Sequence, residues 1–412
     1  MKHLLPLALI TLATLSAAAQ PAGNIIIGKT DTIHSKILGE DRRVLVHVPD
    51  DRQGYASQRY PVVYLLDGDA HFPSVMGMIQ QLTEVNGNSV FPDMILVGIP
   101  NTDRLRDLTP THARSSPYGD SNSVRVSGGG ENFTAFIEKE LMPHIDSLYP
   151  TAPYRIMIGH SLGGLMVINT VVNHPNLFSA YIAIDPSMWW DDRRLLRQTE
   201  TVLAQQKFTG KTLFLAIANT MPAGMDTARV RRDTSNSTIH IRSILRLKDG
   251  LKKNRTNGLR FDYKYYAHDT HGSVPLIAEY DGFRFMFDYF VPPYTQMLFD
   301  DKSTADALVG AVKAHYKMVS EKMGYTILPP ESQINELGYA YMQMGKWDRS
   351  AAFFKMNTEN YPKSGNTFDS LGDLYSTRGD HQKAVDAYTK ALTLYDNPDT
   401  KKKLEEQKSK IP

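Results

Sequence analysis

The chain has 412 residues, with 46 basic and 44 acidic side chains and no cysteine. A formal net charge of only +2 excludes the strongly basic surface of proteins that bind nucleic acids or anionic membranes. The absence of cysteine excludes disulfide bonds, so the core alone must stabilise the fold. The length and a hydrophobic content of 42% predict a globular protein with more than one domain.

The first 19 residues have the features of a cleavable signal peptide. A short basic start precedes an apolar run at residues 4–15, and residues 17–19 are alanines that fit a signal-peptidase site. The run is too short to span a bilayer, and no cysteine follows the cleavage site to carry a lipid. We therefore expect a periplasmic or secreted protein, with no later stretch long enough for a membrane span.

Strand-like and helix-like segments alternate between residues 24 and 292. Residues 24–49 predict two strands joined by a hairpin, which favours an antiparallel opening to a sheet. Continuous apolar runs then predict strands that are buried on both faces, at residues 60–66, 94–99, 154–158, 180–184, 213–218 and 260–266. Predicted helices separate most of them, at residues 73–85, 132–146, 165–172, 239–251 and 277–290. This order predicts an α/β fold with a mostly parallel sheet and helices on both faces.

A separate helical region is predicted after this domain. Residues 293–330 are expected to form a helical linker, with a helix at 306–324. Within residues 331–397, Leu337-Gly338, Tyr341 and Gly345 recur 34 residues later as Leu371-Gly372, Tyr375 and Gly379. That period predicts two tetratricopeptide-like repeats, which we expect to pack on the preceding helix or on the first domain. Residues 398–412 are expected to be a charged tail.

The sequence at residues 159–164, Gly-His-Ser-Leu-Gly-Gly, lies between a predicted strand and a predicted helix. A serine on such a sharp turn is typical of a nucleophile elbow, because only glycine fits two residues before and two residues after it. The helix that follows directs free N–H groups at the same point. The alternative is an ordinary glycine-rich turn, but the flanking segments favour Ser161 as a nucleophile.

A serine nucleophile needs a base, and the elbow fold places a histidine after the last strand. Two candidates follow residues 260–266, and we favour His271 over His268 because it lies just before the last helix. His268, Asp269 and His271 could instead bind a metal ion, but no fourth ligand follows at a recognisable spacing. We therefore predict neither a metal nor a cofactor.

The acid is expected after the strand at residues 213–218. Asp226 is the first carboxylate in that loop, and Asp233 is the second choice. Some esterases work with a serine and a histidine alone, so a dyad without an acid stays open as well.

The remaining site residues follow from their places after strands. The backbone N–H of Leu162 and that of Gly68 or Asp69 would form an oxyanion hole. Trp189 and Trp190 could line an acyl or aryl pocket or could pack a lid helix. Arg104 and Arg106, in a long loop at residues 101–130, could meet an anionic substrate or could hold that loop in place. The expected oxyanion and substrate-binding residues are therefore Leu162, Asp69, Trp189, Trp190 and Arg104.

Four segments together resemble the bacterial Putative esterase family of α/β-hydrolases. They are Tyr-Leu-Leu-Asp-Gly-Asp at 64–69, the elbow at 159–164, Ser-Met-Trp-Trp at 187–190 and His-Gly-Ser at 271–273. The resemblance covers roughly residues 33–290. That family includes siderophore esterases, feruloyl and acetyl-xylan esterases, S-formylglutathione hydrolases and mycolyltransferases. It implies Ser161 as nucleophile, His271 as base, and Leu162 and Asp69 as oxyanion donors. Its acid is often a glutamate shortly after the strand, and this chain has none there.

These observations predict a serine carboxylic-ester hydrolase that acts on a siderophore-type, feruloyl-like or acetyl ester, either small or attached to a glycan. The same residues could instead transfer the acyl group to an alcohol. In a third hypothesis the repeats bind a protein or peptide partner and the hydrolase domain is a non-catalytic scaffold. No nucleic acid is expected as a partner.

Overall fold

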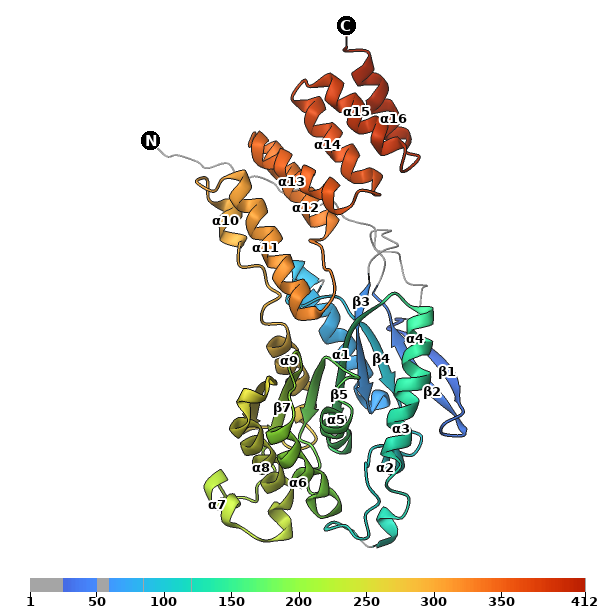
Figure 1. The fold of residues 1–412 in the computed structure, drawn as a ribbon, viewed down its shortest axis with the longest axis vertical. Helices are drawn as coiled ribbons and strands as arrows, with labels where there is room; N and C mark the ends of the chain where they lie inside the picture. Colours follow the sequence, from blue (N-terminus) through green and yellow to red (C-terminus); the bar gives the residue numbers. More distant parts are fainter. Residues whose placement is uncertain (1–24, 50–58, 84, 120, 412) are drawn as a thin grey trace.

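The computed structural model describes residues 25–49, 59–83, 85–119 and 121–411 (Figure 1). The predicted signal peptide at residues 1–19 lies outside these ranges. Among the described residues, none of the helices combines the length and the apolarity that crossing a bilayer requires.

One eight-stranded sheet forms the centre of the first domain, in the order β1-β2-β4-β3-β5-β6-β7-β8. β1 pairs antiparallel with β2, and β2 pairs antiparallel with β4, whereas every later pair is parallel. The predicted antiparallel opening and mostly parallel sheet are therefore confirmed. The strands are β1 Lys29–Ser35, β2 Glu40–His47, β3 Tyr60–Leu66, β4 Ile95–Ile99, β5 Thr151–His160, β6 Ala180–Ile184, β7 Thr212–Ala218 and β8 Arg260–Tyr266.

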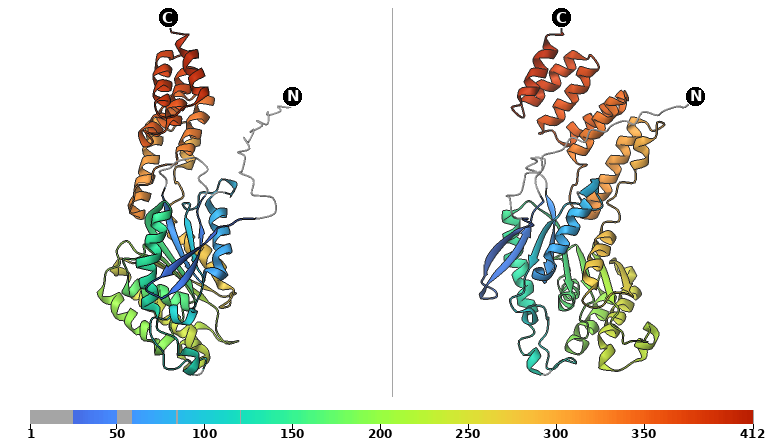
Figure 2. Two further views of the ribbon diagram at one scale, coloured as in Figure 1. Left: turned by 90° about the vertical axis from the view of Figure 1, so that its right-hand side faces the viewer. Right: turned by 180° about the vertical axis from the view of Figure 1, so that it is seen from behind.

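Helices cover both faces of the sheet, which explains why its inner strands read as continuous apolar runs. Every residue of β3, β4, β6 and β7 is buried. On one face the core joins the sheet to α1 (Gly68–Thr83) and α9 (Val274–Met286). On the other face it joins the sheet to α3 (Gly130–Phe136), α4 (Met142–Leu148), α5 (Leu162–Asn173), α6 (Trp190–Gln205) and α8 (Ile239–Lys253). Figure 2 shows these two layers from further sides.

Two helices begin earlier than the sequence predicts, and both starts shape the site. α1 begins at Gly68, directly at the end of β3, rather than at residue 73. α9 begins at Val274, where Pro275 occupies the first turn, a position at which proline needs no amide hydrogen. The predicted helix at 132–146 is observed as α3 and α4, with a π-helical turn between them at Ile137–Leu141.

The C-terminal region is all helical. It contains α10 (Thr295–Phe299), α11 (Ala305–Met323), α12 (Glu331–Gln343), α13 (Trp347–Asn360), α14 (Gly365–Thr377), α15 (His381–Leu392) and α16 (Pro398–Lys408). The repeated glycines have one physical reason, since a Cβ at Gly338 would lie 2.5 Å from the Phe354 ring and one at Gly372 would lie 2.5 Å from the Tyr388 ring. Each glycine therefore lets the paired helix of its repeat approach closely. Much of the expected charged tail forms α16.

Helix α11 connects the two parts of the molecule. Its end contributes Val319 and Met323 to the core under the sheet. Its earlier part contributes Leu308, Val312 and Tyr316 to a core shared with the first repeat. The repeats thus pack on α11, at the end of the sheet where β5 begins, and the loop at residues 101–130 and α7 (Thr227–Arg232) lie at the other end (Figure 1).

Candidate active site

Ser161 lies on a tight turn between β5 and α5. Its backbone has φ 60° and ψ −113°, a conformation that a residue with a side chain rarely adopts. A Cβ built on Gly159 would lie 2.4 Å from the carbonyl carbon of Gly163, so the chain can close this turn only with glycine there. The local sequence therefore produces the predicted elbow geometry.

Replacement of Gly159 by alanine is expected to destabilise the protein by about 3 kcal/mol or more and to abolish most activity, because the added methyl meets backbone that cannot yield. Gly77→Ala, in the middle of α1, is the matched control. A Cβ there has nothing within 4 Å, so it should stabilise the protein by up to about 1 kcal/mol. Thermal and urea unfolding of both variants measures this difference, and equal melting temperatures would contradict the steric argument.

Three neighbouring strands end in strained residues at the same edge of the sheet. Asp67 follows β3 with φ 52°, Ser161 follows β5 with φ 60°, and Asp185 follows β6 with φ 41°. Each such conformation costs about 1–3 kcal/mol and persists only where the surroundings enforce it, which is common at functional sites. The carboxyl edge of β3, β5 and β6 is therefore the candidate site.

A continuous chain of hydrogen bonds joins Ser161, His271 and Asp185. The Ser161 Oγ lies 3.1 Å from His271 Nε2, and His271 Nδ1 lies 2.6 Å from Asp185 Oδ2. Because an ionised carboxylate only accepts, Nδ1 carries the hydrogen and Nε2 is left to accept the serine proton. This is the arrangement of a nucleophile, a base and an orienting acid.

The carboxylate that contacts His271 is Asp185, and not the predicted Asp226 or Asp233. Asp226 accepts hydrogen bonds from the amides of Ala228 and Arg229 at the start of α7, and its side chain is 65% exposed. It is an N-cap, which is a common role for aspartate. Asp233 instead accepts from the hydroxyls of Ser235 and Thr238. Neither carboxylate contacts His271 in the structure.

Asp185 is fully buried and receives three hydrogen bonds. Its Oδ1 accepts from the amide of Ala218 at 3.0 Å, and its Oδ2 accepts from His271 and from His240 Nε2 at 2.8 Å. Burial opposes ionisation, but the bonds from His240 and His271 outweigh it and hold the pKa of Asp185 well below its usual value. The carboxylate is therefore charged at neutral pH.

His160 packs directly against the base, with ring centroids 4.4 Å apart. Burial and the neighbouring His271 lower the pKa of His160 to about 4. His160 is thus neutral near pH 7 and does not oppose a positive charge that forms on His271.

The loop that carries His271 is tied to the end of β7. The amide of Asn219 donates to the Asp269 carbonyl oxygen at 2.8 Å, and its side chain donates to the Ala267 carbonyl oxygen at 3.0 Å. His268 is exposed and makes no contact with Ser161 within the described part of the chain. Among the described residues, the side chains of metal-ligand type that come together are Asp185, His240 and His271, not the alternative set of His268, Asp269 and His271.

The expected oxyanion donors lie in the first turns of two helices, where amides have no acceptor within their own helix. Leu162 begins α5, and Gly68 and Asp69 begin α1. The two helix starts are adjacent, since a Cβ on Gly163 would lie 3.2 Å from the Asp67 carboxylate. This placement suits an anion that forms on a substrate next to Ser161.

The two tryptophans have different surroundings. Trp190 is buried, and its Nε1 donates to the carbonyl oxygen of Thr111 at 3.0 Å, which holds the long loop. Trp189 is half-buried and meets Tyr118 of that loop edge to face, with ring centroids 4.9 Å apart. Tyr118 is 56% exposed, so Trp189 and Tyr118 offer an aromatic surface, whereas Trp190 is a packing residue.

Arg104 is engaged within the protein. Its guanidinium donates to both carboxylate oxygens of Asp67, at 2.6 and 3.0 Å, and to the His160 carbonyl oxygen at 3.3 Å. It therefore ties the long loop to the ends of β3 and β5. Arg106 pairs with Glu40 and Asp107 in a similar way.

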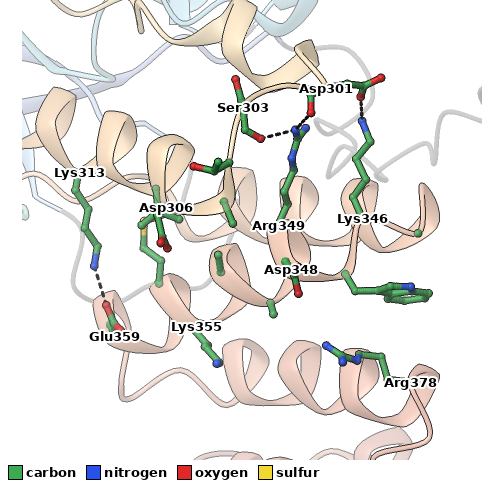
Figure 3. A pocket seen from close by; sticks show the side chains of 18 residues that line it. Asp301, Ser303, Asp306, Lys313, Lys346, Asp348, Arg349, Lys355, Glu359 and Arg378 are labelled. Carbon is green, nitrogen blue, oxygen red and sulfur yellow. Dashed lines mark hydrogen bonds and ion pairs between the residues drawn. The ribbon is translucent and has the colours of Figure 1, made fainter.

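A cavity of about 1200 Å³ lies elsewhere, between α11, α13 and the end of α14. Figure 3 shows two ion pairs among its charged side chains, Lys313 with Glu359 at 2.9 Å and Lys346 with Asp301. It lies at the opposite end of the molecule from the triad (Figure 1), so it is no part of the ester site.

Two residues of the site, Asp185 and His240, were not predicted. Asp185 had a signal, because it directly follows five buried strand residues at the carboxyl edge of the sheet, next to the strand that precedes Ser161. His240 lies in the first turn of α8, 55 residues further along the chain, and no sequence pattern links the two.

Comparison with known proteins gives matches to both parts of the chain. The family model described as Putative esterase matches residues 35–235, and two tetratricopeptide-repeat models match residues 336–364 and 367–402. A crystal structure of an IroE-like serine hydrolase from Shewanella oneidensis is 32% identical, with a TM-score of 0.67, and the match covers 81% of this chain and 99% of that one.

Two curated relatives are named as siderophore esterases. The ferri-bacillibactin esterase BesA of Bacillus subtilis is 32% identical over 174 residues, which are 39% of this chain and 58% of BesA. The siderophore enterobactin esterase of Emericella nidulans is 29% identical over 164 residues, which are 37% of this chain and 52% of the relative. The chain thus spans little more than half the length of the curated relatives that it matches.

Proposed function

Because the chain belongs to the Putative esterase family, we propose that it is a serine hydrolase that cleaves carboxylic esters through an acyl-enzyme on Ser161. The observation that carries this proposal is the hydrogen-bonded chain from the Ser161 Oγ through His271 to the buried Asp185. A buried carboxylate and an oriented imidazole are what a serine hydroxyl needs to act as a nucleophile at neutral pH.

The reaction has two steps, formation of the acyl-enzyme and its hydrolysis. The Ser161 Oγ attacks the ester carbonyl carbon, and its proton passes to His271 Nε2, while the carbonyl oxygen becomes an anion facing the amides of Leu162 and Asp69. The bond to the alcohol breaks, and the alcohol leaves with the proton from His271. Water then attacks the acyl carbon and gives a proton to His271. The acid leaves, and His271 returns this proton to the Ser161 Oγ.

We propose a siderophore-type ester as the substrate. The named activities of the curated relatives support this choice, as does the aromatic surface of Trp189 and Tyr118, which suits an aryl ring on the acyl group. The test is chromatographic analysis of the purified protein with a trilactone siderophore, a feruloyl ester and an acetyl ester. A kcat/KM for the siderophore below that for the feruloyl or acetyl ester would overturn the substrate choice and leave the ester chemistry standing.

The same products also decide between hydrolysis and transfer. With an added alcohol, a hydrolase releases the free acid, whereas an acyltransferase yields a new ester. An exported location stays a prediction from the sequence, since it depends on residues outside the described ranges.

Deletion of residues 331–412 is expected to change kcat/KM for a short p-nitrophenyl ester by less than about 3-fold. The repeats lie at the end of the sheet opposite the triad, so they contribute no wall to the site (Figure 1). The deletion exposes Leu308, Val312 and Tyr316 on α11, which should lower the stability by several kcal/mol, at about 1.5–3 kcal/mol for each large apolar side chain.

Active-site titration with a fluorophosphonate counts the folded molecules and removes the effect of this lower stability from the rate. A loss of kcat/KM per titrated site of more than about 10-fold would show that the repeats shape the active site. An unchanged rate favours a separate role for the repeats, such as binding of a protein partner.

A further inference from the structure

The triad carboxylate serves two histidines, not one. His240 Nε2 lies 2.8 Å from Asp185 Oδ2, the same oxygen that His271 Nδ1 approaches at 2.6 Å. The two imidazole rings stand at 90° with centroids 5.1 Å apart. Because an ionised carboxylate only accepts, His240 must carry its hydrogen on Nε2 to make this bond.

His240 is held where this bond requires it. Its side chain is 12% exposed, and it belongs to the first turn of α8. Ile241 and Ile244 of this helix are buried in the core on the face of the sheet that α5 covers. Tyr118 of the long loop lies against its backbone. The contact is therefore built into the fold and does not depend on a mobile surface side chain.

We propose that His240 is a positioning residue for the ester hydrolysis, which holds Asp185 Oδ2 in line with His271 and shares its negative charge. This inference rests on the proposed function of Ser161, His271 and Asp185. With the amide of Ala218 on Oδ1 and His240 on Oδ2, the carboxylate stays fixed while His271 gains and loses its proton. A carboxylate bonded to His271 and Ala218 alone could rotate, and small displacements at a catalytic group can lower a rate by about 100-fold.

Two further titratable side chains contact the pair of histidines. His160 from β5 packs on His271, and Tyr118 lies against the backbone of His240. Neither is a carboxylate, so neither competes with Asp185 for the N–H groups of the two rings.

Two variants separate the hydrogen bond from the charge. His240→Ala removes the bond, and His240→Gln keeps a neutral N–H donor in place of Nε2 but cannot be protonated. For a short p-nitrophenyl ester, we expect the alanine variant to lose about 10- to 100-fold in kcat with KM within about 2-fold.

The glutamine variant should recover kcat to within about 3-fold of the wild type, because its side-chain amide can donate to the same carboxylate oxygen. Melting temperatures of all three proteins show that each is folded at the assay temperature. A wild-type kcat in His240→Ala would overturn the proposal, and so would a loss that His240→Gln does not recover.

The rate at which a fluorophosphonate labels Ser161 gives the same comparison without an ester substrate, with Ser161→Ala as the blank. The labelling rate should fall in His240→Ala and recover in His240→Gln by the same factors as kcat. A wild type that is labelled but hydrolyses no ester would overturn only the proposed ester activity, and the labelling rates would still decide the role of His240. A wild type that is neither labelled nor active would overturn both.

Discussion

Replacement of Ser161 by alanine is expected to lower kcat for ester hydrolysis by about 10⁵- to 10⁶-fold, because it removes the hydroxyl that His271 Nε2 contacts. The residual rate would come from binding and from the oxyanion donors alone. Substrate binding should change little, since alanine removes one oxygen from an otherwise unchanged turn. Steady-state rates with short p-nitrophenyl esters measure the loss, and circular dichroism confirms that the variant is folded.

The matched control is the serine next to the nucleophile. The Ser187 side chain is buried, and its Oγ lies 3.3 Å from the Ser161 Oγ. Within the described residues, however, the base His271 contacts Ser161 and not Ser187. Ser187→Ala should therefore lose less than about 10-fold in kcat, which is the cost of a changed neighbour rather than a lost nucleophile. Activity of Ser161→Ala within 100-fold of the wild type would exclude Ser161 as the nucleophile.

Replacement of Asp185 by asparagine should lower kcat by about 10⁴-fold while leaving the fold intact. The side chain keeps its size, but its amide nitrogen beside His271 favours the tautomer with hydrogen on Nε2, which cannot accept the serine proton. The loss of the negative charge also removes the partner of the imidazolium that forms in the reaction.

Asp226→Asn tests the acid that the sequence favoured. Asparagine caps helices about as well as aspartate. The free energy of unfolding should therefore be nearly unchanged, and kcat should stay within about 2-fold of the wild type. If Asp226→Asn lost 100-fold or more and Asp185→Asn did not, the acid would be Asp226 and the hydrogen bond to Asp185 would be incidental.

The fold and the turn that carries Ser161 were predictable because local physical limits determine them. Runs such as residues 60–66 and 213–218 are apolar throughout only when helices cover both faces of a sheet, which the structure shows. Gly159 and Gly163 surround Ser161 because a side chain at residue 159 would collide with the backbone of residue 163. His271 was predictable from its place between the last strand and the last helix of the domain.

The acid was not predicted, because its assignment depends on contacts between segments far apart in the sequence. Asp226 satisfied the expected order of serine, acid and histidine, but so does Asp185, which follows the strand next to the elbow in the sheet. The loop of His271 is tied to Asn219 at the end of β7. Only the structure shows that the His271 ring nevertheless contacts Asp185, at the end of β6, and not Asp226. The contact of His240 with the same carboxylate depends on the packing of α8 and has no local pattern.

The position of the repeats also required the structure. The 34-residue period and the Gly338–Phe354 and Gly372–Tyr388 contacts specify each helix pair, but not the end of the sheet on which the pairs lie. Helix α11 decides this, because its two ends belong to different cores.

The most direct test of the account is mass spectrometry of the full-length protein after reaction with a fluorophosphonate. We predict one adduct per chain, located on the peptide that contains Ser161, with a labelling rate that falls strongly in Asp185→Asn and His271→Ala and stays unchanged in Asp226→Asn. An adduct on another serine, or labelling of Ser161 at the same rate in Asp185→Asn as in the wild type, would contradict a triad of Ser161, His271 and Asp185.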